Sequence, residues 1–158
     1  MAAPARPSED NGFLAPHIAV LRRSFRHFTG RELVPARMTD PEAGRYLFRA
    51  PLALLSHDTS PDPIFNYANE TAMELFGMSW EEITALPSRL SAEPVDREAR
   101  DALLAKVAAQ GHIDDYSGIR ISRQGRKFRI ENAVVWNLFD ELGSPCGQAA
   151  MFEHWQWL

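Results

Sequence analysis

The first segment with a regular spacing of apolar residues runs from Pro16 to Gly30. Its apolar side chains recur every three or four residues, at Ile18, Leu21, Phe25 and Phe28. This spacing predicts a helix with one narrow apolar face, which a proline begins and a glycine ends. The preceding residues 1–12 mix alanine, proline and polar residues, so we predict a disordered leader there.

Prolines mark a connector after this helix, and helix and connector together form an N-terminal segment over residues 13–44. A longer domain follows over residues 45–158 and begins with one short helical turn at 45–49. Two apolar runs then flank a turn rich in Pro and Asp. They predict two strands, at 52–57 and 64–68.

Capping residues and helical spacing predict further helices after these strands. Asn69 is a suitable N-cap for the first of them, and Gly77 suits its C-terminal end. Ser79 and Glu82 have the spacing of a capping box at the start of the second. Asp96 is in place to cap a third, longer helix.

From residue 119 onward the apolar period shortens to two, which is typical of strands. Ile119 and Ile121 alternate with Arg120 and Ser122, and a turn, RQGR, follows. In the next strand one face is apolar apart from Asn132, and its members are Phe128, Ile130, Val134, Trp136 and Leu138. The turn DELGSP then leads to a last strand, CGQAAMFEHW.

The order of two strands, a helical stretch and three strands indicates an α+β fold with a five-stranded antiparallel sheet. Helices from the middle of the chain are expected on one face. The other face of the long strand is half apolar, since Val135 and Phe139 lie beside Arg129 and Glu131. The helix at 16–30 has an apolar face suited to cover it. The same face suits a second copy of the chain equally well, so a covering helix and a homodimer both remain open.

Composition changes this picture little. The chain has 158 residues, of which 45% are apolar, and this length suits one domain. No apolar run exceeds four residues, which excludes a membrane-spanning helix. The start of the chain lacks the apolar core of a signal peptide, and the single Cys146 permits no internal disulfide. We therefore expect a cytoplasmic protein without membrane contact.

Charge is unevenly distributed within the net value of −4. Residues 51–115 carry four basic and twelve acidic side chains, which does not suit contact with phosphates. One local basic cluster lies on the first predicted helix, formed by Arg22, Arg23, Arg26, His27 and Arg31. A solvated helix face explains it, so nucleic acid binding is not expected.

Three consecutive residues, Ser56, His57 and Asp58, have the residue types of a hydrolytic triad. Because neighbours in a strand point to opposite faces, we do not expect a triad here. Further along, His112 and the acids at 114 and 115 lack the spacing of metal ligands, so we expect no metal site.

Polar side chains on otherwise apolar elements are the best candidates for a ligand-binding pocket. They are His57, Asn66, Tyr67, Arg89, Asn132, Trp136 and Gln148. Each side chain also has a structural explanation, which is to satisfy neighbouring polar groups inside a closed core. Arg89 either pairs with an acid such as Glu93 or faces an anionic ligand.

The element order is that of a PAS domain, and several stretches resemble the MEKHLA domain. They are LALLSHDTSPDPIFNYAN, ELFGMSWEEITALPSRLSAEPVDREAR, DDYSGIRIS and FRIENAVVWNL with GQAAMF. This PAS-like family occurs alone in bacteria, the form expected here, and at the C-terminal end of plant homeodomain–leucine zipper proteins. The chain has neither a homeodomain nor a zipper, so the resemblance implies no DNA binding. It supplies no catalytic residue.

The resemblance implies a non-enzymatic sensory or protein-interaction module. The candidate pocket residues would let such a module hold a small hydrophobic or aromatic ligand between sheet and helices. Light-sensing flavin domains of this fold need a cysteine in the helical segment, whereas Cys146 begins the last strand. Non-covalent flavin stays open, and the cofactor is unknown. The alternative is an enzyme with a curved-sheet pocket of the ketosteroid isomerase type, in which His57 or Asp58 acts as acid or base.

Overall fold

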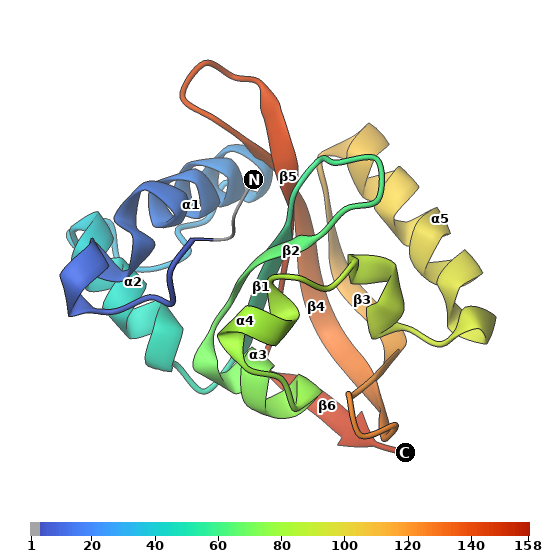
Figure 1. The fold of residues 1–158 in the computed structure, drawn as a ribbon. Helices are drawn as coiled ribbons and strands as arrows, with labels where there is room; N and C mark the ends of the chain where they lie inside the picture. Colours follow the sequence, from blue (N-terminus) through green and yellow to red (C-terminus); the bar gives the residue numbers. More distant parts are fainter. Residues whose placement is uncertain (1–3) are drawn as a thin grey trace.

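The computed structural model describes residues 4–158 (Figure 1). A six-stranded antiparallel sheet forms its centre, with the order β2-β1-β5-β4-β3 and β6 also paired to β4. The strands are β1 (Ala53–His57), β2 (Phe65–Ala68), β3 (His112–Ile121), β4 (Lys127–Phe139), β5 (Pro145–Phe152) and β6 (His154–Trp157). The helices are η1 (Glu9–Leu14), α1 (Ala15–Thr29), α2 (Asp40–Arg49), α3 (Glu70–Phe76), α4 (Trp80–Ile83), η2 (Ser88–Ser91) and α5 (Pro94–Gln110).

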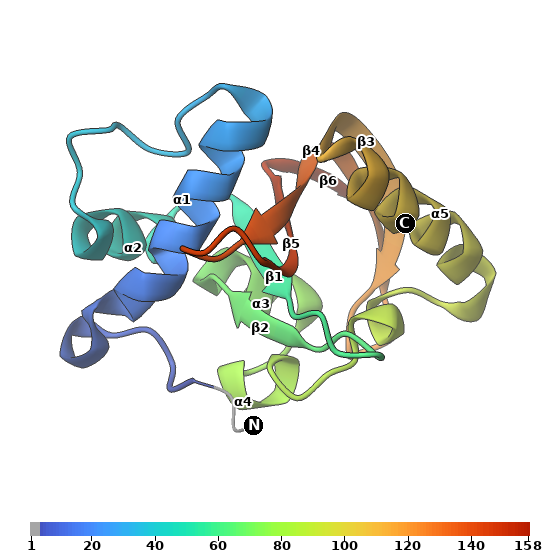
Figure 2. The same cartoon turned by 90° about the horizontal axis from the view of Figure 1, so that it is seen from above.

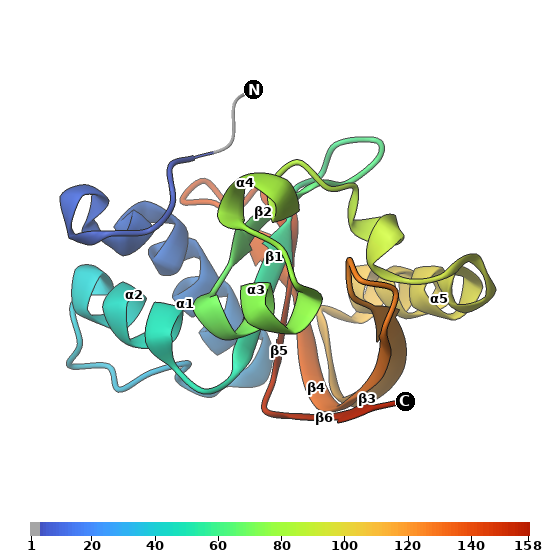
Figure 3. The same ribbon diagram turned by 60° about the horizontal axis from the view of Figure 1, so that its bottom comes forward.

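Helices lie on both sides of the sheet. Figure 2 shows α1 and α2 on one side and α5 on the other, and Figure 3 shows α3 and α4 beside β1 and β2. The α+β prediction, with an antiparallel sheet, helices on one face and an N-terminal covering helix on the other, is therefore confirmed. The predicted last strand breaks at Glu153 into β5 and β6, which pair with different halves of β4.

The apolar stripe of α1 packs on the sheet of its own chain. Ile18, Leu21 and Phe25 are buried, and the Phe25 ring meets the Trp136 ring edge-on at 5.0 Å. Phe28 is half-buried against Phe139. In this structure the stripe is thus a covering surface for the sheet of its own chain. A homodimer stays a prediction.

The N-terminal segment is more ordered than predicted. Residues 1–3 of the predicted leader lie outside the described residues. From Pro4 onward the chain packs on the domain: the Trp80 Nε1–H donates to the Pro4 carbonyl, and Arg45 pairs with Glu9. The predicted turn at 45–49 is the end of the ten-residue α2, which begins with a Thr39–Glu42 capping box.

The helix predicted from Asp96 begins earlier. Pro94 occupies the first turn of α5 and Glu93 is its N-cap, so Asp96 already lies inside the helix. Proline suits this position because its missing N–H has no partner in a first turn anyway. Asn69 and Ser79 cap α3 and α4 as predicted.

A bulge at Asn132 exchanges the two faces of β4. Asn132 has a φ of 53°, and the pairing of β3 with β4 shifts beside it, from Gly118 opposite Ile130 to Tyr116 opposite Ala133. One extra residue in a strand moves every later side chain to the other face. Strict alternation predicts that Trp136 shares the face of Ile130. Because of the bulge, Trp136 faces α1 instead.

A hydrogen-bonded chain connects α1 to the sheet. The Ser56 hydroxyl donates to Asn66 Oδ1 at 2.5 Å and lies 2.9 Å from His17 Nε2. Because the hydroxyl has one proton, His17 must donate to it. The imidazole also stacks on Tyr67. Burial lowers the pKa of His17 from 6.5 to about 4, so the folded protein holds this side chain neutral.

We expect stability to fall as the pH drops from about 6.5 to about 4, because unfolded His17 takes up a proton throughout this window and folded His17 does not. The loss between pH 7 and 4.5 attributable to His17 is about 2 kcal/mol. In His17→Gln, which keeps a donor for Ser56, urea unfolding at the two pH values should differ less than in wild type. His154→Gln, at an exposed position, should keep the wild-type dependence. If the free energy of unfolding changed equally between the two pH values in all three proteins, the assignment of this pH dependence to His17 would be wrong.

Candidate functional site: a cavity between the sheet and α5

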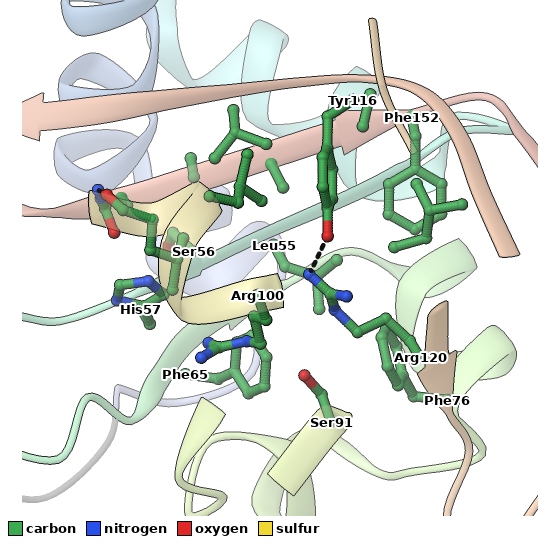
Figure 4. Close-up of a pocket in the computed structure, with 18 residues that line it drawn as sticks. Leu55, Ser56, His57, Phe65, Phe76, Ser91, Arg100, Tyr116, Arg120 and Phe152 are labelled. Atoms are coloured by element: carbon green, nitrogen blue, oxygen red, sulfur yellow. Dashed lines mark hydrogen bonds between the residues drawn. The ribbon is translucent and has the colours of Figure 1, made fainter. Parts of the chain in front are cut away.

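A cavity of about 60 Å³ lies between the sheet and α5 (Figure 4). Its walls are mostly apolar and include Leu55, Phe65, Phe76, Leu103, Leu104, Tyr116, Ile130, Ala133, Val135, Ala149, Ala150 and Phe152. The polar side chains that line it are those of Ser56, His57, Ser91, Arg100, Arg120 and Gln148. Apolar walls with a few placed polar groups are the usual composition of a small-molecule site.

A larger groove of about 740 Å³ adjoins this cavity. The end of α1, the β1–β2 turn, α5 and the β4–β5 hairpin supply its walls, including the exposed Thr59 and Pro145. His57, Leu104 and Gln148 line both spaces. These three side chains therefore form the partition between the inner cavity and the outer groove.

Arg100 brings a cation to the cavity from α5. The side chain is 7% exposed, and one N–H donates to the Ser88 hydroxyl at 2.7 Å. Its one acidic neighbour in the described chain is Asp101, 3.7 Å away and itself mostly exposed. Burial, together with the positive charge of Arg120, lowers the pKa of Arg100 to about 10. The guanidinium stays protonated at neutral pH, and its one salt-bridge partner in the described chain is the largely exposed carboxylate of Asp101.

Arg120 brings a second cation from β3. It is 8% exposed and donates to the Ile119 carbonyl at 2.9 Å and the Tyr116 hydroxyl at 3.1 Å. Within residues 4–158 it forms no salt bridge. A guanidinium has five N–H donors, so both arginines keep donors free for another acceptor.

His57 is the third polar group of interest. Its Nδ1 lies 2.9 Å from the Asp58 carbonyl, which accepts the ring proton and leaves Nε2 as an acceptor. Nε2 is buried and has no partner. Burial lowers the pKa of His57, and although the bond to the Asp58 carbonyl opposes this, the ring is neutral at pH 7. A buried acceptor at the partition is satisfied by a donor from a ligand or water.

Asp58 is occupied by the turn that follows β1. Its Oδ1 accepts from the Ser60 N–H, the Ser60 hydroxyl and the Ile64 N–H. Burial raises its pKa, but these hydrogen bonds outweigh burial and hold the pKa below its ordinary value. His57 faces the carbonyl rather than the carboxylate of Asp58, so the geometry does not favour the isomerase-type acid–base pair.

Two of the predicted ligand-binding residues reach the cavity, His57 and Gln148, which pair across β1 and β5. Gln148 is held there because its side-chain N–H₂ donates to the Leu104 carbonyl and to Asn137 Oδ1. The first bond connects β5 to α5, and the second connects β5 to β4. A shift of α5 would break the bond between Gln148 and the Leu104 carbonyl, so this bond is expected to respond to a ligand in the cavity.

The other predicted site residues lie elsewhere. Tyr67 and Trp136 are fully buried under α1, on the opposite face of the sheet. Asn66 bonds to Ser56, and Asn132 is exposed at the bulge. Arg89 pairs with Asp62 at 3.1 Å, across the loop, and not with Glu93. Local alternation cannot show which face a residue takes after a bulge, and β2 and β4, which carry Asn66, Tyr67, Asn132 and Trp136, each contain one.

The structure adds Arg100, Arg120 and Ser91 to the site. Arg120 alternates with isoleucines, a pattern that normally puts the charged residue in water. Arg100 lies three residues before Leu103, on the buried side of α5. For either arginine, that spacing is the one feature of the sequence that indicates burial in the cavity.

An antiparallel sheet with a cavity beneath a helical segment and a separate N-terminal helix on the opposite face defines a PAS-like domain. The MEKHLA domain model matches residues 15–157, so the chain belongs to the MEKHLA domain family. Homeobox-leucine zipper protein REVOLUTA of Arabidopsis thaliana is 27% identical over 75% of this chain and 14% of its own length. Homeobox-leucine zipper protein HOX10 of Oryza sativa subsp. japonica is 27% identical over 90% of this chain and 18% of its own. The chain thus spans less than a fifth of these relatives.

Solved structures confirm the fold. The PAS domain of a protein from Colwellia psychrerythraea has a TM-score of 0.60 and 18% identity, over 69% of this chain and 90% of that one. An RNA-binding light-oxygen-voltage receptor has a TM-score of 0.59 and 18% identity, over 76% of this chain and 33% of that one.

None of the helices in residues 4–158 has the length and apolarity needed to cross a bilayer. Over the same residues, no three His, Cys, Asp or Glu side chains gather where they would hold a metal ion.

Proposed function

We propose that the domain is a non-enzymatic sensory module that responds to a small molecule bound between its sheet and α5. The observation that carries the proposal is the cavity itself, whose polar groups include two under-paired arginines and an unpartnered imidazole nitrogen. Family membership supports a signalling role. The cytoplasmic location, the absence of DNA binding and the stand-alone bacterial form remain predictions.

The size of the cavity limits the ligand. About 60 Å³ accommodates a short organic molecule or a few waters, whereas a dry cavity that binds benzene measures about 150 Å³. A flavin does not fit, since even drug-sized ligands need about 300 Å³ or more. Cys146 also lies on β5, outside the helical segment. The site therefore favours a small metabolite over a large cofactor.

Binding is expected to act through α5. Its buried Leu103 and Val107 pack with Val135 in a small cluster separate from the main core. Gln148 and Asn137 add hydrogen bonds to the carbonyls of Leu104 and Val107. A ligand that bridges α5 and the sheet should reduce the motion of the helix relative to the sheet.

Cavity filling tests the proposal. Thermal unfolding is measured with isobutanol, propionamide, isobutyramide, propionate and isobutyrate, for wild type, Ala133→Leu and the exposed control Ala102→Leu. At least one probe should raise the midpoint of wild type and control and slow hydrogen exchange in α5, and Ala133→Leu should lose both effects. If no probe acts on wild type, or if the filled variant responds equally, the proposal fails.

A further inference from the structure

We propose that the ligand is a small carboxylate, bound by Arg100 and Arg120 through its oxygens and by the apolar wall through its short tail. This inference rests on the proposed function and specifies its ligand class. It follows from two buried guanidinium groups that face one cavity without a buried acid between them (Figure 4).

Charge is the first argument. Burying a cation is costly unless an anion and hydrogen bonds compensate for the lost water. Arg100 and Arg120 also repel each other, because each carries a full positive charge in the same low-dielectric space. The exposed Asp101, 3.7 Å from Arg100, is the sole acidic side chain within salt-bridge distance of either arginine in the described chain. An anion between the two guanidinium groups relieves both costs at once.

Hydrogen bonding is the second argument. Arg100 makes one side-chain hydrogen bond and Arg120 makes two, although each guanidinium has five donors. Planar guanidinium groups match the two oxygens of a carboxylate, and such charged bonds are about twice as strong as neutral ones. The arginines come from different elements, α5 and β3, so one carboxylate would connect helix and sheet.

The remaining wall sets the shape of the ligand. Phe65 and Phe76 offer an apolar surface near the arginines (Figure 4), and Ile130 lines the same cavity. The available volume suits a short aliphatic tail and is too small for a ring. His57 Nε2, at the partition toward the outer groove, can accept a hydrogen bond from a hydroxyl on the tail.

The decisive comparison is between carboxylates and their isosteric amides on the wild-type protein. It does not depend on whether any variant folds. Dissociation constants of propionate and isobutyrate are measured by NMR titration against those of their isosteric amides, propionamide and isobutyramide, with sodium chloride at matched ionic strength as the ion control. Each carboxylate should bind at least about tenfold more tightly than its amide, a difference of about 1.4 kcal/mol. Amide protons of α5 and β3 should shift together.

Variants then locate the charge. Arg100→Gln and Arg120→Gln should each weaken isobutyrate binding at least about tenfold and leave isobutyramide binding within about twofold. Arg120→Lys keeps the positive charge but loses the planar guanidinium that can bind both carboxylate oxygens. It should retain part of the affinity for isobutyrate. Lys106→Gln and Arg129→Gln remove exposed cations from α5 and β4 and should change nothing.

The outcomes separate the two proposals. If the amides bind as well as the carboxylates, or if chloride protects equally, the carboxylate inference is overturned and the small-molecule site stands. If isobutyrate binding survives in both glutamine variants, the anion lies elsewhere and the inference is likewise wrong. If none of these compounds binds wild type, the proposed function itself fails.

Discussion

Asn69→Asp is expected to destabilise the protein by about 4 kcal/mol at pH 7, although aspartate is as good an N-cap as asparagine. Asn69 is fully buried. Its Oδ1 accepts from the N–H groups of Ala72 and Leu54, a role that aspartate would keep. Its Nδ2 donates to the carbonyls of Leu47 and Leu52 at 2.9 and 2.6 Å. Aspartate replaces these donors by a charged oxygen aimed at two carbonyls.

Urea unfolding of the Asn69→Asp protein and of the control Asn132→Asp tests this. Asn132 is exposed and has a left-handed conformation that aspartate tolerates, so the control should stay within about 0.5 kcal/mol of wild type. The penalty at Asn69, taken against wild type at the same pH, should shrink toward pH 4, where a protonated carboxyl recovers one donor. A loss below about 1 kcal/mol would show that Asn69 acts as a helix cap alone.

Trp136→Ala is expected to lower the free energy of unfolding by about 3 kcal/mol. The side chain is completely buried between β4 and α1, and large-to-small replacements of buried aromatic residues cost about 3–5 kcal/mol. The expected value lies at the low end because the Trp136 Nε1–H is buried without a partner. Removing it relieves a desolvation cost of about 1 kcal/mol or more.

Two further variants separate these terms in the same unfolding measurement. Trp136→Phe keeps a ring against Phe25 and removes the unpaired N–H, so we expect a loss below about 1.5 kcal/mol. Trp157→Ala, on the exposed strand β6, should cost less than half of the Trp136→Ala value. Equal losses at Trp136 and Trp157 would mean that the contact with α1 contributes little stability.

The two faces of one sheet have different roles. On the α1 face, large aromatic residues fill the space between helix and sheet, and the Tyr67 hydroxyl and Trp136 Nε1 are left without partners. On the α5 face, small residues such as Ala133 and Ala150 leave a cavity. A ligand site on the first face was a sequence-based expectation for Tyr67 and Trp136, and the packing of α1 removes the room it would need.

The candidate site was only partly predictable. His57 and Gln148 are polar residues on apolar strands, which is a local signal, and both line the cavity. Arg100 and Arg120 look like ordinary charged residues of a helix and an edge strand. Their burial depends on how α5 crosses the sheet, and neither residue spacing nor charge reports that crossing.

Local physical chemistry determined the elements. Glycines end α1 and α3 because they adopt left-handed conformations at low cost, and Asn69 and Ser79 begin helices because their side chains accept backbone protons. The change of apolar period from about 3.6 to 2 separated the helical middle from the strands. The order of these elements indicated the fold class before any contact was known.

Only the tertiary structure decided which side chains meet. Strict alternation in β4 placed Trp136 with Ile130, but one left-handed residue at 132 reversed the faces of everything after it. Arg120 lies opposite the buried Phe128 in the β3–β4 ladder, so the pairing of the strands places it on an inward face. The period of a strand is a local property, whereas the face that becomes the core depends on every bulge and helix crossing. The cavity with its two cations is therefore a property of the folded chain that the sequence pattern does not reveal.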